Sequence, residues 1–155
     1  MGRGHLIRRA ALVAALLWVS AAAAAGTQRP WSLQGTTEPV GAQAPRTYLA
    51  ARRAALQPWV NRLTPAHRAR VGAVDFTRTF VVAAFLDGQN CVFDVRLDGW
   101  AHTGSRLIVD VSYRKPPIGV ATCVRTSVSY VVLGFNRAGF GRLPASVVLR
   151  AHARA

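Results

Sequence analysis

The stretch VDFTRTFVVAAFLDGQNC, Val74–Cys91, decides the fold. Its centre, Phe80–Phe85, is a continuous apolar run followed by the turn residues LDGQN. A run of this length between turns is typical of a strand that is buried on both faces of a sheet. Asp75, at the entry to the run, has no His, Cys or acid partner within a motif, and Asp at such a position accepts hydrogen bonds from nearby backbone N–H groups. We therefore predict that Asp75 is a structural clasp that orients the strand, and not a general base.

Two segments after this strand alternate between apolar and polar residues, as half-buried strands do. They are CVFDVRLDGW, residues 91–100, and RLIVDVSYRK, residues 106–115. The polar loop AHTGS between them predicts a hairpin whose turn is centred near Thr103. In that register Leu97 faces Val109 and Arg96 faces Asp110. We therefore expect a cross-strand ion pair between Arg96 and Asp110.

The remaining patterns complete an α+β domain. Further strands are expected over Thr126–Phe135, where Gly134 indicates a bulge or a close approach, and over ASVVLRA, residues 145–151. Upstream, Thr47–Leu63 spaces apolar residues three and four apart, which predicts an amphipathic helix that Pro58 kinks. The predicted fold is a mostly antiparallel, twisted sheet of five or six strands, open or barrel-like, with this one Pro-kinked helix packed on it.

The ends of the chain have a different character. Residues 1–25 carry three Arg residues, then an apolar run, then Ala23-Ala24-Ala25, which is the layout of a secretory signal peptide cleaved before Gly26. An uncleaved membrane anchor is the alternative. We expect a linker or N-terminal arm at 26–45, with a short strand at WSLQG, residues 31–35, as an alternative within it, a single β-rich domain at 46–150 and a tail at 151–155. The predicted location is periplasmic or secreted. No Cys lies near the cleavage site, so we do not expect a lipoprotein.

Cys91 and Cys123 are the two cysteines of the chain. In an oxidising compartment an isolated pair is usually a disulfide, so we predict a Cys91–Cys123 bond. A redox pair is the alternative, but the short C-x-x-C spacing that lowers a thiol pKa is missing. The sequence has no C-x-x-C or paired-His motif, so we expect no metal site and no cofactor.

Positive charge is the strongest feature of the composition. The chain has 20 Lys and Arg residues against 6 acidic residues, a formal net charge of +14, and only Lys115 is a lysine. The arginines are scattered, without a basic block or an aromatic ladder for stacking bases, so we expect no nucleic-acid partner. Adhesion to an anionic membrane or cell surface through Arg residues stays open.

No motif for catalysis is present. The sequence lacks G-x-S-x-G, H-E-x-x-H and a phosphate-cradling Gly loop, so we expect no catalytic residue. A Ser–His–Asp triad assembled from distant positions is the alternative, with His102 beside Asp98 or Asp110.

Several short motifs resemble the PrcB-type domain, a family of protease-complex subunits in bacterial exported proteins. The matching stretches are WVNRL at 59–63, VDF at 74–76 with FVVAA at 80–84, RLIVDVSYRKPP at 106–117, and Thr126 with YVVLGF at 130–135. Where the family usually has a Gly-Gly-Tyr cluster the chain reads GQNCVF, residues 88–93. It also has TSVSY where the family commonly has Pro after Thr.

The resemblance implies a non-enzymatic domain that binds and stabilises a protein partner in the cell envelope, such as an exported protease. No catalytic residue comes with it, and the oligomeric state stays undetermined. The alternatives are a small secreted hydrolase and an Arg-rich adhesion module for anionic surfaces, which requires arginines clustered on one face.

Overall fold

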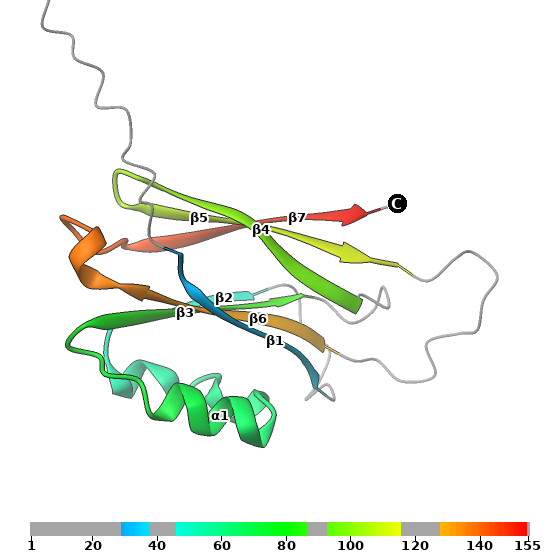
Figure 1. Cartoon of the computed structure of the whole chain (residues 1–155), viewed down its shortest axis with the longest axis horizontal. Helices are drawn as coiled ribbons and strands as arrows, with labels where there is room; N and C mark the ends of the chain where they lie inside the picture. The colour runs from blue at the N-terminus through cyan, green and yellow to red at the C-terminus, as the bar shows by residue number, and fades with distance from the viewer. Residues whose placement is uncertain (1–28, 38–45, 87–92, 116–127, 155) are drawn as a thin grey trace, which may run out of the picture.

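The computed structural model describes residues 29–37, 46–86, 93–115 and 128–154. Its elements, in chain order, are β1 (Trp31–Thr37), β2 (Arg46–Ala50), η1 (Arg53–Leu56), η2 (Val60–Arg62), α1 (Pro65–Gly72), β3 (Thr79–Leu86), β4 (Phe93–Thr103), β5 (Arg106–Arg114), β6 (Val128–Asn136), η4 (Arg137–Gly139) and β7 (Ser146–Arg154). They form three layers, which Figure 1 shows edge-on. Sheet 1 lies in the middle, sheet 2 covers one of its faces, and the helical segment at 51–78, here called the cap, covers the other.

Sheet 1 has the strand order β1-β6-β3-β2, and every neighbouring pair is antiparallel. Its two central strands, β3 and β6, are buried along almost their whole length. The prediction of a strand buried on both faces at Phe80–Phe85 is confirmed. Alternate residues of β3 face opposite layers, so an apolar residue is needed at every position.

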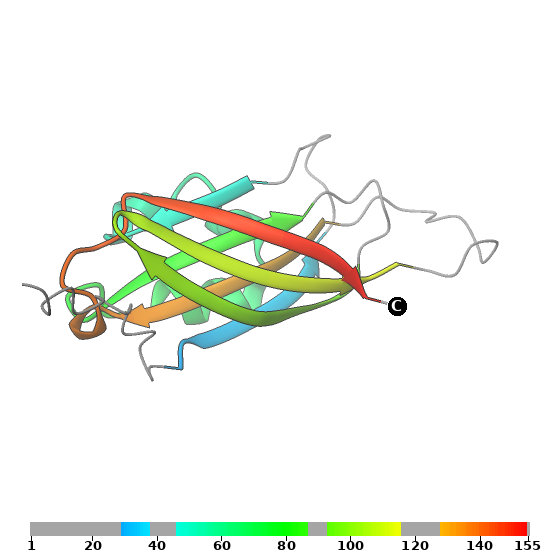
Figure 2. The same cartoon turned by 90° about the horizontal axis from the view of Figure 1, so that it is seen from above.

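Sheet 2 has the order β4-β5-β7, with β4 and β5 antiparallel and β5 and β7 parallel. The turn between β4 and β5 contains Gly104, whose φ of 59° is the left-handed value that the first position of a type II′ hairpin turn requires. Figure 2 views the molecule from the side of sheet 2, whose strands cross over those of sheet 1. The α+β class and the mostly antiparallel pairing are confirmed, but the strands form two sheets instead of one sheet.

Two apolar cores hold the three layers together. Between the sheets, Phe80 and Phe135 stack with ring centroids 5.2 Å apart, and Phe140 meets the Phe80 ring edge-on at 4.9 Å. Between sheet 1 and the cap, Trp59 is fully buried and contacts the rings of Tyr48 and Phe85. Full burial of one such side chain contributes roughly 1.5–3 kcal/mol, so both cores are substantial.

The predicted helix over Thr47–Leu63 is wrong. Its first residues form β2, which pairs with β3, and the rest forms two short 3₁₀ turns, η1 and η2. Pro58 lies between those turns, where it cannot donate the backbone hydrogen bond that a continuous helix needs. The α-helix begins at Pro65, in the segment next to it, and Pro is well suited to a first helical position.

The predicted domain limits also differ from the structure at both ends. β1 lies within the expected linker at 26–45 and pairs with β6, where the Trp31 indole covers Gly134 so closely that a Cβ would overlap it. This is the close approach expected at Gly134. Residues 151–154, expected as a tail, belong to β7 and pair with β5. The segments 1–25, 38–45 and residue 155 lie outside the described residues.

Candidate functional site

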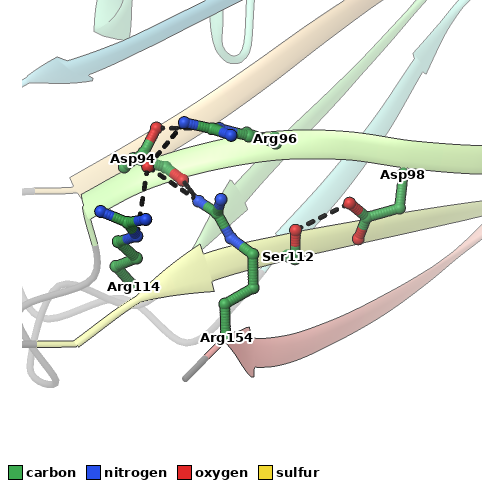
Figure 3. Close-up of polar contacts among 6 residues, drawn as sticks. All are labelled: Asp94, Arg96, Asp98, Ser112, Arg114 and Arg154. Carbon is green, nitrogen blue, oxygen red and sulfur yellow. Dashed lines mark hydrogen bonds and ion pairs between the residues drawn. The ribbon is translucent and has the colours of Figure 1, made fainter.

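A bulge in β4 places Asp94 among three arginines. The register of β4 against β5 shifts between Phe93 and Arg96, and Asp94 has a φ of 48°, which is uncommon for a residue with a side chain. This conformation turns the Asp94 carboxylate across the outer face of sheet 2 (Figure 3).

Each arginine around Asp94 comes from a different strand. Arg96 of β4 donates from Nε and Nη2, both at 3.2 Å, and Arg154 of β7 donates from Nη2 to Oδ2 at 3.0 Å. Arg154 also donates to the Asp94 carbonyl oxygen, and Arg114 Nε of β5 lies 3.7 Å from Oδ2. Asp94 therefore ties the three strands of sheet 2 together at one point.

The charge state of Asp94 follows from these contacts. Burial acts to raise the pKa of its carboxyl, but hydrogen bonds from Arg96 and Arg154, together with their positive charges, outweigh it and leave the pKa below its ordinary value. Asp94 is thus ionised at neutral pH. Three cations around one anion leave this cluster with a formal charge of +2.

A second bulge, between Leu97 and Gly99, displaces Asp98 from the ladder. The Ser112 hydroxyl donates to Asp98 Oδ1 at 2.7 Å, and His152 Nε2 lies 3.6 Å from Asp98 Oδ2. Asp98 is therefore between the hydroxyl and the imidazole. A nucleophile–His–acid triad needs the imidazole beside the hydroxyl, because the imidazole takes the hydroxyl proton.

The register of β4 against β5 also explains why the predicted Arg96–Asp110 ion pair is wrong. Arg96 lies opposite Ser112 and bonds to Asp94, whereas Asp110 lies opposite Gly99. The turn is centred between Gly104 and Ser105 instead of near Thr103, which alone would move each partner by three residues, and the bulge between Leu97 and Gly99 takes one residue back. Leu97 consequently faces Val111, two residues from the predicted Val109, so the apolar residues stay on the inner face.

His102 does not meet Asp98 or Asp110, contrary to the triad alternative. The bulge at Asp98 turns the later residues of β4 over, so His102 points inward and its ring lies 5.0 Å from that of Phe140. Its Nε2 is buried and has no hydrogen-bond partner among the described residues. His67 of α1 lies with Nδ1 2.8 Å from the hydroxyl of Tyr130, a fully buried residue of β6.

The cap presents a different arrangement of arginines. Two of them bond to backbone carbonyls: Arg53 to Gly72 and Val74, and Arg68 to Asn61 and Leu63. Two others lie over aromatic rings at about 6 Å: Arg62 over Tyr48 and Phe85, and Arg70 over Trp31. These contacts are favourable, but a carbonyl or a ring does not cancel the charge.

Asp75 is the only acid of the cap. Its Oδ1 accepts hydrogen bonds from the backbone N–H and the hydroxyl of Thr77 at 2.9 and 2.6 Å, and these bonds hold the pKa of Asp75 below its ordinary value. Its carbonyl accepts from the N–H groups of Arg78 and Thr79, just where β3 begins. These hydrogen bonds are the ones expected of a residue that fixes the entry to a strand. Arg78 approaches Asp75 only to 3.9 Å.

The cap consequently carries a large formal positive charge. Residues 51–78 contain six arginines and one acid, a formal charge of +5, and all of these arginines except Arg62 are exposed. No pattern in the sequence showed this cluster, because its members are spread over 27 residues. The 3₁₀ turns and α1 bring them onto one layer.

Some predicted features concern other parts of the chain. Cys91 and Cys123 lie outside the described residues, as does the predicted signal peptide. Within the described ranges, no three His, Cys, Asp or Glu side chains come together as metal ligands. No helix in the part of the chain that the structure describes is long and apolar enough to cross a bilayer.

Comparisons with protein-family models, with curated proteins and with solved structures each found no match.

Proposed function

We propose that this chain is an exported, non-enzymatic domain that binds and stabilises a protein partner in the cell envelope, with its cap against an acidic surface of that partner. The observation that carries the proposal is the charge of the cap. Six guanidinium groups accompany one carboxylate there, and four of the six are held by carbonyls and rings. A surface of this kind attracts an anionic partner and increases the rate of encounter.

The chemistry of arginine favours carboxylates as the groups bound. The guanidinium is a planar fork with five N–H donors that matches a carboxylate with two parallel hydrogen bonds. Arg53 and Arg68 are also pre-oriented by their bonds to carbonyls, so less side-chain entropy is lost when a partner binds. An Asp- and Glu-rich protein surface satisfies both requirements.

The anionic-surface alternative is favoured by the same cluster but lacks a second requirement. A peripheral membrane segment usually inserts large apolar side chains below its basic residues. Among the described residues, Val148 is the one large hydrophobic side chain that is exposed, and it belongs to β7 and not to the cap. We therefore assign the cap to a protein partner.

The PrcB resemblance supports the same direction, because that family implies partner binding without catalysis. The motifs WVNRL and VDF, which carry part of the resemblance, lie at 59–63 and 74–76, within the cap. Export is part of the proposal and rests on the signal-peptide pattern of residues 1–25.

The test is affinity capture from the native cell envelope with three forms of the protein. The cap variant, Arg52→Glu with Arg70→Glu, lowers the formal charge of the cap from +5 to +1. The control, Arg106→Glu with Arg142→Glu, makes the same change of net charge at exposed residues outside the cap. Captured proteins are quantified by mass spectrometry at low and high salt.

We expect one stoichiometric protein on the wild type and on the control. The cap variant should retain at least about tenfold less of it, because exposed charge contacts contribute up to about 1 kcal/mol each and reversal makes them repulsive. Capture should also weaken with salt. Equal capture by the cap variant would refute the proposal. Binding to phosphatidylglycerol vesicles, with no protein recovered, would replace it by the anionic-surface alternative.

A further inference from the structure

Among the edge strands of the two sheets, β7 is the one least protected against pairing with another strand. β2 has five residues and β1 has seven, and the eleven residues of β4 are interrupted by two register shifts. β7 pairs with β5 over nine consecutive residues without a shift and contains no Pro. Long, regular edges accept further strands, and proteins usually blunt them by bulges or short length.

The backbone groups on the free edge of β7 can be assigned from one contact. Thr47 of β2 donates its hydroxyl to the carbonyl oxygen of Val147 at 3.4 Å, so this carbonyl points away from β5. Because strand residues alternate with a period of two, the N–H and C=O groups of Leu149, Ala151 and Ala153 point to the same side. In the described part of the chain nothing else bonds to them.

The side chains of β7 determine which strand fits. The outer-face residues Arg150, His152 and Arg154 alternate along it, and the exposed Val148 precedes them. Antiparallel pairing of two copies would place Arg150 and Arg154 within one ladder, where like charges are destabilising. A partner strand with acidic residues at every second position would instead place carboxylates beside Arg150 and beside the Asp94 cluster, which keeps a formal charge of +2 although Arg154 already bonds to Asp94.

We propose that the free edge of β7, from Val148 to Arg154, accepts an extended protein segment with alternating acidic side chains, which adds a fourth strand to sheet 2. Backbone hydrogen bonds to Leu149, Ala151 and Ala153 supply affinity, and Arg150 and Arg154 supply the preference for acidic residues. This surface is separate from the cap, so neither proposal depends on the other.

The test uses a labelled eight-residue peptide of alternating Glu and Thr, with a Lys and Thr peptide as its control. Fluorescence anisotropy measures binding to the full chain. Ala151→Pro removes an N–H group on the free edge, a position where edge strands tolerate Pro. The matched variant, His152→Pro, removes an N–H group that points to β5, so it should lower the Tm, whereas Ala151→Pro should leave the fold intact.

We expect saturable binding of the Glu peptide, binding of the Lys peptide at least tenfold weaker, and a loss of at least tenfold for Ala151→Pro. The cap variant Arg52→Glu with Arg70→Glu should keep the part of the binding that Ala151→Pro removes. Unchanged binding to a folded Ala151→Pro variant, equal binding of both peptides, or loss of binding only in the cap variant would overturn the proposal. So would a wild-type dimer that Ala151→Pro dissociates, because the edge would then belong to a second copy.

Amide hydrogen exchange of the wild type provides the same answer without a substitution. In the free protein, the amides of Leu149, Ala151 and Ala153 should exchange quickly, and those of Val148, Arg150 and His152 slowly. The Glu peptide should slow the first set by at least tenfold and leave the second set unchanged. Protection of neither set, at a peptide concentration that saturates the anisotropy signal, would show that the peptide binds elsewhere and would overturn the proposal.

Discussion

On the outer face of sheet 2, three arginines from three strands converge on one carboxylate, that of Asp94, whereas on the cap six arginines accompany the single acid Asp75. In the first region all three guanidinium groups contact the same carboxylate and so join three strands, of which β7 is distant in the sequence. In the second region Arg53 and Arg68 bond to carbonyls and Arg70 covers a ring, and none of these contacts cancels a charge. The same residue type therefore joins strands at Asp94, whereas on the cap we propose that it serves recognition.

If cap arginines serve recognition, the cohesion of the cap must come from its apolar residues, and Trp59 provides the strongest test. Its side chain is fully buried between the cap and sheet 1. Trp59→Ala should lower the free energy of unfolding by about 3–5 kcal/mol, because it leaves a cavity as well as removing apolar contact. Urea unfolding followed by circular dichroism measures this loss. Trp59→Phe keeps a ring and is the control, and a loss below about 1 kcal/mol for Trp59→Ala would contradict the packing.

How well the sequence predicts each region depends on whether a local sequence pattern specifies its structure. β3 was predictable because its buried faces require an unbroken apolar run, which is a local pattern. The segment at 47–63 was not, because residues three and four apart reach one face in a 3₁₀ turn as well as in an α-helix. Its apolar residues Leu56, Trp59 and Leu63 pack in the core between the cap and sheet 1, although they belong to 3₁₀ turns and the residues next to them and not to an α-helix.

The Asp94 cluster depends on structural features that no local sequence pattern indicates. Two bulges set the register of β4, and each one moves later residues to the opposite face. The parallel pairing of β5 with β7 brings Arg154 to Asp94 across sixty positions, and no periodicity indicates that pairing. The Asp75 turn, by contrast, involves Thr77 only two residues away, and such short-range geometry can be expected from an Asp at a strand entry.

The pH dependence of stability should show how far the charge of Asp94 holds its cluster together. The folded pKa of Asp94 is depressed, so its stabilising contribution is fully present above the unfolded value, about 3.9, and is lost as the pH falls through the folded pKa. Asp94→Asn should lower the Tm at pH 7, and the difference from the wild type should shrink below about pH 4. Differential scanning calorimetry from pH 7 to pH 2.5 measures this. A difference that stays constant over the whole range would show that Asp94 acts through its shape and not through its charge.

The smallest effect is expected at Arg52, and it separates recognition from cohesion most directly. Arg52 is an exposed cap residue, so Arg52→Ser should change the free energy of unfolding by no more than about 0.5 kcal/mol. Arg154→Ser removes the bonds to Asp94 and should lower the Tm clearly, although it makes the same change of charge. In the capture experiment the order should reverse, with partner binding weakened by Arg52→Ser and kept by Arg154→Ser below its Tm. If both substitutions changed stability equally, the cap arginines would be part of the fold, and the division between the two regions would not hold.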